Sequence, residues 1–158
     1  MDDIADAQLQ GIEQQLGPAF CRLHGGPDNA PALPGAYALL LHLDRPCGFS
    51  WRREEARLPA GWYLYAGSAR GGGGIRARLR HHFRPDKRPH WHVDNLTTAA
   101  RTLRALVAVD GAECAIVARL VAGGQCRVPI AGFGSSDCRC CPSHLLALTA
   151  TEPASPRS

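Results

Sequence analysis

The chain has 158 residues, 45% of them hydrophobic, with 18 lysines and arginines against 14 aspartates and glutamates and a formal net charge of +4. This length and apolar content predict one folded domain with a modest core. They argue against a membrane-spanning protein, because no stretch approaches the roughly 20 consecutive apolar residues that a bilayer-crossing helix needs.

The N-terminal segment predicts a weakly amphipathic helix followed by a linker. Apolar residues recur at helical intervals within residues 2–16, namely Ile4, Ala7, Ile12 and Leu16. Glycine and proline interrupt residues 24–34 too often for regular structure. We therefore expect residues 1–34 to precede a domain that begins at Gly35. The acidic start lacks the apolar core of a signal peptide, so we expect a cytoplasmic protein with reduced or metal-bound cysteines.

Two dense apolar runs predict strands at residues 35–43, "GAYALLLHL", and residues 61–67, "GWYLYAG". Residues 44–60 between them are polar and too many for a tight hairpin. We expect this connection to form a mobile loop or to hold a small extra element.

A glycine-rich turn after the second strand predicts the start of a helix over residues 75–84. Ile75, Leu79 and Phe83 form one apolar stripe on this helix. Arg78 and His82 lie at the edge of the stripe, so we expect the helix to present both beside the end of the strand. The stretch "GSARGGGG" lacks the lysine and hydroxyl residue of a phosphate-binding P-loop, so we interpret the glycines as a flexible turn.

The remaining segments predict a short helix at residues 90–100, a third strand at 102–110 and a helix at 112–124. Glu113 lies in the first turn of the last helix, where the helix dipole favours a carboxylate, although its Ala-Ile-Val run also suits a strand. Residues 132–148 are rich in turns and thiols and would close the core. We expect an α+β domain over residues 35–149 around a small three-stranded sheet, and a disordered tail over 150–158.

Positive charge is concentrated between residues 70 and 92, where it attracts polyanions such as nucleic acid. A solvated basic face is the alternative, and docking of an acidic protein partner is another. Trp91 suits either stacking on a base or capping the core. The residues expected to contact nucleic acid are Arg70, Arg76, Arg80, Arg84, Lys87, Arg88 and Trp91.

Tyrosines on two strands, an arginine on the following helix and a later glutamate suit phosphodiester hydrolysis. This reaction needs an activated water, positive charge on the phosphoryl oxygens and a metal ion. Arginine binds phosphate oxygens in pairs, and a lone carboxylate suits Mg²⁺. A tyrosine serves as the base only if nearby cations lower its pKa, which is normally about 10.

The order of motifs resembles the GIY-YIG nuclease superfamily: "GAY" at 35–37, "YAG" at 65–67, "RLRHH" at 78–82 and a later acidic residue. The stretches "RARLRHHF", "HWHVDNL", "AECAI" and "GFGSSDCRC" followed by "SHL" look more narrowly like its DUF123-like branch, often labelled Uri-type endonuclease. The resemblance covers residues 35–148. Ala36 in place of the usual isoleucine and the long connection between the tyrosine motifs depart from the family pattern.

This resemblance implies a mainly antiparallel GIY-YIG nuclease-like fold and a metal-dependent endonuclease that cleaves nucleic acid, with DNA as the expected substrate. It assigns water activation to Tyr37 or Tyr65, phosphate contact to Arg78, substrate or proton handling to His82, and Mg²⁺ or Mn²⁺ binding to Glu113. Without it, the tyrosines would be read as packing residues and Glu113 as a helix-dipole carboxylate. The alternative function is a nucleic-acid-binding module that does not cleave.

A second candidate site lies in the thiol-rich segment near the C-terminus. Cys138, Cys140, Cys141 and His144 offer soft ligands within a short stretch, and Cys114 or Cys126 would complete a tetrahedral zinc site. Buried structural thiols are the alternative. The sequence therefore predicts Cys138, Cys140 and His144 as zinc ligands, which would also suit a zinc-stabilised binding module.

Overall fold

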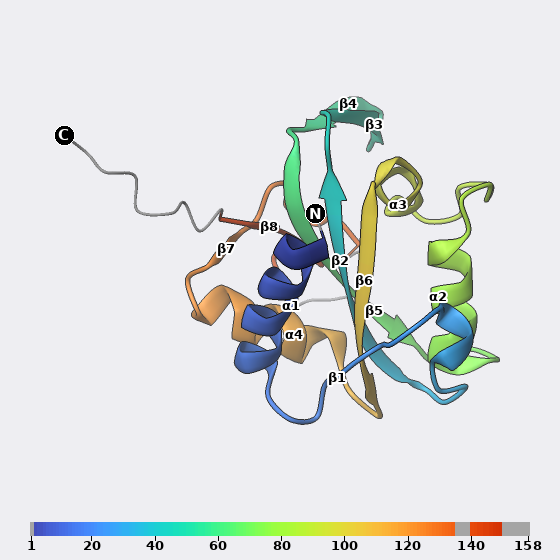
Figure 1. Cartoon of the computed structure of the whole chain (residues 1–158). Coiled ribbons are helices and arrows are strands. Elements are labelled where there is room, and N and C mark those ends of the chain that lie inside the picture. Colours follow the sequence, from blue (N-terminus) through green and yellow to red (C-terminus); the bar gives the residue numbers. More distant parts are fainter. Residues whose placement is uncertain (1, 135–139, 150–158) are drawn as a thin grey trace.

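A twisted antiparallel sheet organises the computed structural model, which describes residues 2–134 and 140–149 (Figure 1). Within these residues the main sheet has six strands in the order β1-β6-β2-β5-β8-β7. These strands are β1 (Cys21–Arg22), β2 (Gly35–Leu43), β5 (Gly61–Ala69), β6 (Thr102–Val109), β7 (Cys126–Arg127) and β8 (Leu145–Leu148). The helical elements are α1 (Asp2–Leu16), the 3-10 turn η1 (Pro27–Asn29), α2 (Gly74–Phe83), α3 (Asp94–Ala99) and α4 (Glu113–Ala122).

The prediction of a mixed, antiparallel fold is confirmed, but the prediction of a three-stranded main sheet is wrong. The three predicted strands form its centre as β6, β2 and β5. The added strands β1 and β7 have 2 residues each, and β8 has 4. Strands this short contain too few residues for an alternating pattern to emerge from the sequence.

The connection between the first two predicted strands contains a small extra element. This was one of the two alternatives expected for it. β3 (Cys47–Trp51) and β4 (Glu54–Leu58) pair as a separate antiparallel hairpin. The segment expected to be a helix or a strand at residues 112–124 is the helix α4. The predicted tail at 150–158 lies outside the described residues.

Helices cover both faces of the sheet, so its central strands are buried on both sides. Along β2, Ala36, Ala38 and Leu40 face the α1 and α4 side, whereas Tyr37 and Leu39 face the α2 side. This double burial explains why "GAYALLLHL" lacks polar alternation. On the α1 and α4 side, the helices pack against the sheet through Leu9, Ile12, Leu16, Ile116, Val117 and Leu120.

The N-terminal helix packs on the sheet and shares its core. Its buried stripe is Ala5, Leu9, Ile12 and Leu16. Ile4 was expected in this stripe but is 52% exposed. Ala7 was expected there too and is exposed, whereas Ile12 and Leu16 are buried as expected.

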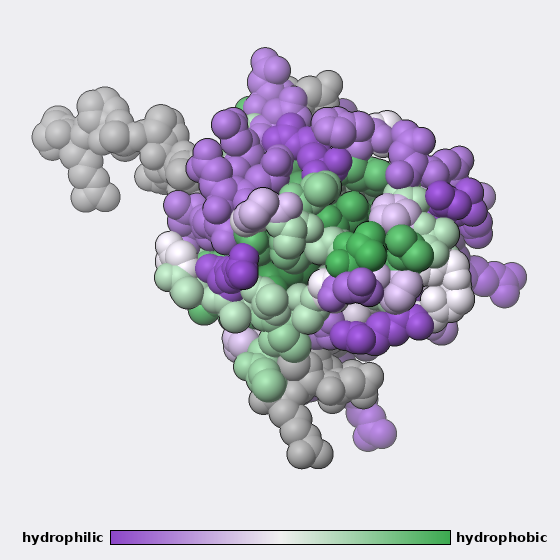
Figure 2. Space-filling view, turned by 90° about the horizontal axis from the view of Figure 1, so that it is seen from below, coloured by the Kyte–Doolittle hydropathy of each residue, from purple (hydrophilic) through white to green (hydrophobic). Residues whose placement is uncertain are grey.

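One end of the sheet exposes apolar side chains. Leu33 and Val109 are 51% and 46% exposed, and Val109 pairs with Gly35 at the start of β2. Seen from below, hydrophobic surface occupies the middle of the molecule and hydrophilic side chains surround most of it (Figure 2). No helix among the described residues combines the length and the apolar character needed to cross a membrane.

Candidate active site

Side chains from several helices, strands and connections line one pocket of about 440 Å³. Tyr37 of β2, Tyr65 of β5, Arg78 of α2 and Glu113 of α4 all line it. The pairing of β8 covers β5 only from Tyr63 to Tyr65, so the last part of β5 opens toward the pocket. Four of the five side chains that the sequence assigned to cleavage therefore line one pocket, and the fifth, His82, is not among its lining residues.

A glycine allows the ring of Tyr37 to lie across the neighbouring strand. The register pairs Tyr37 with Gly67, the last residue of "YAG". A Cβ atom at Gly67 would lie 2.2 Å from Cζ and 2.4 Å from Oη of Tyr37. Gly67 is required because any side chain would occupy the place of the tyrosine ring.

The hydroxyl of Tyr37 reaches a buried histidine. Tyr37 Oη lies 2.6 Å from His82 Nε2, and each residue is 1% exposed. Burial lowers the pKa of His82 to about 3, although nearby Asp94 acts in the opposite direction. His82 is therefore neutral at physiological pH, and its contact with Asp94 is not an ion pair there.

Asp94 favours one tautomer of this histidine. His82 Nδ1 lies 3.8 Å from Asp94 Oδ1, which is too far for a hydrogen bond but favours a proton on Nδ1. Nε2 then accepts the hydrogen bond from Tyr37, and the lone pairs of the tyrosine oxygen remain for a ligand in the pocket.

Asp94 also holds the segment before α3. Its Oδ2 accepts hydrogen bonds from His81 Nε2 at 2.9 Å and from the backbone N–H groups of His90 and Trp91 at 2.6 and 2.9 Å. Burial alone would raise its pKa, but the hydrogen bonds from Trp91, His81 and His90 keep the pKa of Asp94 below its usual value. Asp94 was not among the residues predicted for the site; its signal in the sequence is an acidic residue that follows a His-Trp-His segment in a basic region.

Both pocket tyrosines are harder to ionise than free tyrosine. Burial, and then the neighbouring Tyr65, raise the pKa of Tyr37 well above 10.0, and Arg78 offsets only part of this. Burial likewise raises the pKa of Tyr65 to about 12 despite Arg78. The lowered tyrosine pKa that a phenolate base requires is thus not found, because loss of solvent outweighs the nearby positive charge.

Arg78 is held in place by an aromatic ring. Its Cζ lies 4.4 Å from the ring centroid of Trp91, a cation–π contact that directs the guanidinium along the pocket wall. Arg52, at the turn between β3 and β4, adds a second cation to the lining, with its Cζ 5.0 Å from the Trp51 ring. Arg52 was not predicted for the site, because residues 44–60 were expected only as a loop or a small extra element.

Glu113 provides the only carboxylate among the described lining residues. It is the first residue of α4, and its Oε2 is buried without a hydrogen-bond partner in the described part of the chain. A buried carboxylate oxygen without a donor is costly, and a bound cation would satisfy it. The residue therefore fits the role of a ligand to a hard divalent metal ion.

The expected nucleic-acid contacts are distributed unevenly. Of those seven residues, only Trp91 lines the pocket among the residues that the structure describes. Arg70, Arg84 and Arg88 are exposed. The others have partners: Arg80 Nε binds Asp28 at 2.6 Å, Arg76 Nε donates to the Ala30 carbonyl at 2.8 Å, and Lys87 Nζ donates to the carbonyls of His82 and Arg84 at 2.7 and 3.0 Å.

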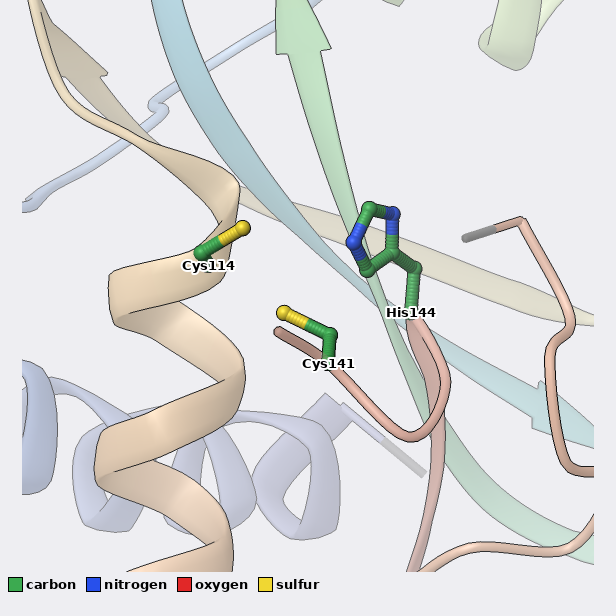
Figure 3. A group of neighbouring side chains, drawn as sticks. All are labelled: Cys114, Cys141 and His144. Carbon is green, nitrogen blue, oxygen red and sulfur yellow. The ribbon is translucent and has the colours of Figure 1, made fainter. Parts of the chain in front are cut away.

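A second group of possible metal ligands lies beside the pocket. One ligand atom from each of Cys114, Cys141 and His144 falls within 4.8 Å of the other two (Figure 3). Of the zinc ligands predicted from the sequence, His144 belongs to this group and Cys140 is exposed and outside it. Cys138 lies outside the described residues.

Comparison with known proteins gives one match. The model of a family described as "Domain of unknown function DUF123" matches residues 36–157. No curated protein and no solved structure matches the chain. The matched range contains all the pocket residues named above and both groups of possible metal ligands.

Proposed function

The chain belongs to the DUF123 family of domains of unknown function, and we propose that it is a divalent-metal-dependent endonuclease that hydrolyses phosphodiester bonds in nucleic acid, with DNA as its substrate. The convergence of Tyr37, Tyr65, Arg78 and Glu113 on one pocket carries this proposal. Hydrolysis of a phosphodiester needs groups that accept a proton, a cation that binds the phosphate and a carboxylate oxygen that is free to bind a metal ion. In this proposal the sheet and its helices are a variant of the GIY-YIG nuclease fold.

Tyr37 and His82 together move the proton of the attacking water. The water oxygen forms a bond to phosphorus as the P–O bond on the opposite side breaks, and the departing alkoxide takes a proton from solvent. The water proton passes to Tyr37 Oη, and Tyr37 passes its own proton to His82 Nε2, 2.6 Å away. No free phenolate forms, which matters because burial raises the pKa of Tyr37. Asp94, 3.8 Å from His82 Nδ1, stabilises the transient imidazolium.

Arg78 and Arg52 hold the phosphoryl group. A guanidinium stays charged at every physiological pH and binds phosphate oxygens in pairs. The stacked Trp91 ring restricts Arg78, so less conformational entropy is lost when substrate binds. Tyr65 lines the same wall and, with its pKa raised to about 12, remains a hydrogen-bond donor to the phosphate.

Glu113 is the residue that would hold Mg²⁺ or Mn²⁺, through its buried and unpartnered Oε2. When bound, such an ion stabilises negative charge on the phosphate and on the departing oxygen. The rest of the coordination sphere suits water and substrate oxygens, the usual ligands of Mg²⁺ in sites with a single carboxylate.

Exposed arginines next to the pocket would follow the rest of the nucleic-acid backbone. Arg70 follows β5 and Arg84 and Arg88 follow α2, so all three flank the elements that carry Tyr65 and Arg78. Binding through such residues is sensitive to salt, because each neutralised phosphate releases counterions.

The test compares Glu113→Gln with wild type for both cleavage and binding. We expect wild type to cut oligonucleotides in Mg²⁺ or Mn²⁺ and to stop in excess chelator, and we expect the variant to lose at least about 100-fold in rate. Gel-shift affinity should stay within a few-fold, since Gln keeps the shape of the side chain. Glu54→Gln, an exposed residue of β4, is the matched control and should cut normally.

Two results would contradict the proposal. Tight binding by wild type with no cleavage in either metal would favour the non-cleaving nucleic-acid-binding module. Equal cleavage rates for wild type and Glu113→Gln would show that the carboxylate is not needed for the reaction.

A further inference from the structure

We propose that Cys114, Cys141 and His144 bind one Zn²⁺ ion, a site chemically separate from Glu113 and independent of the nuclease proposal. Their ligand atoms lie within 4.8 Å of one another. In a tetrahedral zinc site with Zn–S of about 2.3 Å and Zn–N of about 2.0 Å, ligand atoms are separated by roughly 3.5 Å. The three side chains would have to rotate to close that difference.

His144 carries the strongest signal for a bound ion. The residue is 6% exposed, and its Nε2 is buried without a hydrogen-bond partner among the described residues. Figure 3 shows its ring turned toward the sulfur atoms of Cys114 on α4 and Cys141 on the segment before β8. An imidazole nitrogen left unpaired in the interior is costly, and a metal ion facing it would satisfy it.

The donor set selects the metal. Two thiolates and an imidazole are soft to borderline ligands that favour Zn²⁺ over Mg²⁺ or Mn²⁺, which prefer oxygen. Three protein ligands leave one position of the tetrahedron for water or another donor.

The site also has a route for the ion to enter. Cys114 and Cys141 line a second pocket of about 470 Å³ beside α4, whereas His144 lines the pocket that contains Tyr37 and Glu113. The ion would therefore lie between the two pockets and be reached from the α4 side.

The ion would fix two parts of the candidate active site relative to each other. Cys114 follows Glu113 in the first turn of α4. The carbonyl of His144 accepts a hydrogen bond from the N–H of Ala66 at 2.8 Å, one residue after Tyr65. Zinc at this point would thus connect the helix that carries Glu113 to the strand that carries Tyr65.

The test measures metal, not activity. The purified full chain should contain about one zinc per molecule by elemental analysis, and Cys114→Ser and Cys141→Ser should each lose it. Cys140→Ser is the matched control, because Cys140 adjoins Cys141 but is exposed and outside the group, and it should keep its zinc. Chelator-stripped wild type refilled with Co²⁺ should show a thiolate-to-cobalt absorption band, which should be absent in each serine variant of the site.

Several outcomes would overturn the site. These are wild type without bound zinc and without a thiolate-to-cobalt band, or zinc lost in Cys140→Ser but kept in Cys114→Ser. Far-UV circular dichroism shows whether each variant is folded. If a serine variant unfolds, the cobalt spectrum of wild type decides: the band supports the site, and its absence contradicts it.

Discussion

Tyr37 and His82 share a hydrogen bond of 2.6 Å in an environment from which both have lost water. Burial disfavours the charged form of each, so tyrosinate and imidazolium are both poorly populated at neutral pH. A proton that passes between them must therefore move together with the chemical step. For this reason the pair suits a proton relay, whereas a mechanism that needs a stable phenolate does not fit this site.

We expect Tyr37→Phe to lower the cleavage rate by about 10²–10⁴-fold, since it removes the group that receives the proton of water. The variant should also lose about 1–3 kcal/mol of stability, because His82 Nε2 is left buried and unpaired. Tyr63→Phe is the matched control. Tyr63 is also a buried tyrosine, but it belongs to β5 and does not line the pocket. Its hydroxyl donates a hydrogen bond to the Pro59 carbonyl at 2.6 Å. Full cleavage by Tyr37→Phe would exclude the relay.

The buried neutral His82 predicts a loss of stability in mild acid. Burial holds its folded pKa at about 3, below the ordinary 6.5, so between these values only the unfolded chain binds the proton. The neutral His82 makes its full contribution to the free energy of unfolding above about pH 6.5. Below that pH the free energy of unfolding falls by up to about 1.4 kcal/mol per pH unit, until the pH reaches the folded pKa. The charged and titratable groups around it are Asp94, His81, Lys87 and Arg78.

Urea unfolding between about pH 7 and about pH 5.5 measures this slope. We expect His82→Gln to flatten it, whereas His24→Gln should leave it unchanged because His24 is exposed. An equally steep slope in His82→Gln and wild type would show that another group titrates in this range.

At the scale of elements, the pairing of β2 with β5 decides where the tyrosine hydroxyl lies. Gly67 stands opposite Tyr37, and an added methyl group would meet the ring at 2.2 Å. We expect Gly67→Ala to push the ring away from His82, costing about 1–3 kcal/mol of stability and at least about 100-fold in cleavage rate.

Gly48→Ala is the matched control for this strand glycine. Its nearest contact to an added Cβ would be 3.8 Å, an ordinary van der Waals distance, and it lies in β3. Thermal unfolding and cleavage should be close to wild type. If Gly67→Ala also kept both properties, the ring of Tyr37 would not depend on this close approach.

Periodicity predicted the central elements but not the edges of the sheet. β2 was predicted with its observed bounds because a long apolar run between proline and aspartate has few alternatives, and α2 because Ile75 and Leu79 recur one helical turn apart. β1 and β7 depend on pairing with distant strands, not on local pattern. The same holds for the β3–β4 hairpin, whose turn at Arg52 and Arg53 adopts positive φ without glycine.

At the scale of the whole molecule, the fold brings together residues that lie far apart in the sequence. Tyr37, Tyr65, Arg78 and Glu113, which belong to four separate sequence motifs, all line one pocket. Asp94 was not predicted as a site residue, although its partners His90 and Trp91 lie close to it in the sequence. Arg52 could not be placed, because its position depends on the β3–β4 hairpin. Cys114 was one of two candidates to complete a zinc site, and only the fold shows that it lies with Cys141 and His144.

Cleavage of labelled single-stranded, duplex and branched nucleic acids in Mg²⁺ or Mn²⁺ tests the central claim most directly. Wild type should be compared with Tyr37→Phe, Arg78→Ala and Glu113→Gln, each checked for folding by circular dichroism. We expect wild type to cut and all three folded variants to lose at least about 100-fold in rate. Cleavage that survives in all three folded variants, or salt-sensitive binding by wild type without any cleavage, would contradict the assignment of this pocket as a nuclease active site.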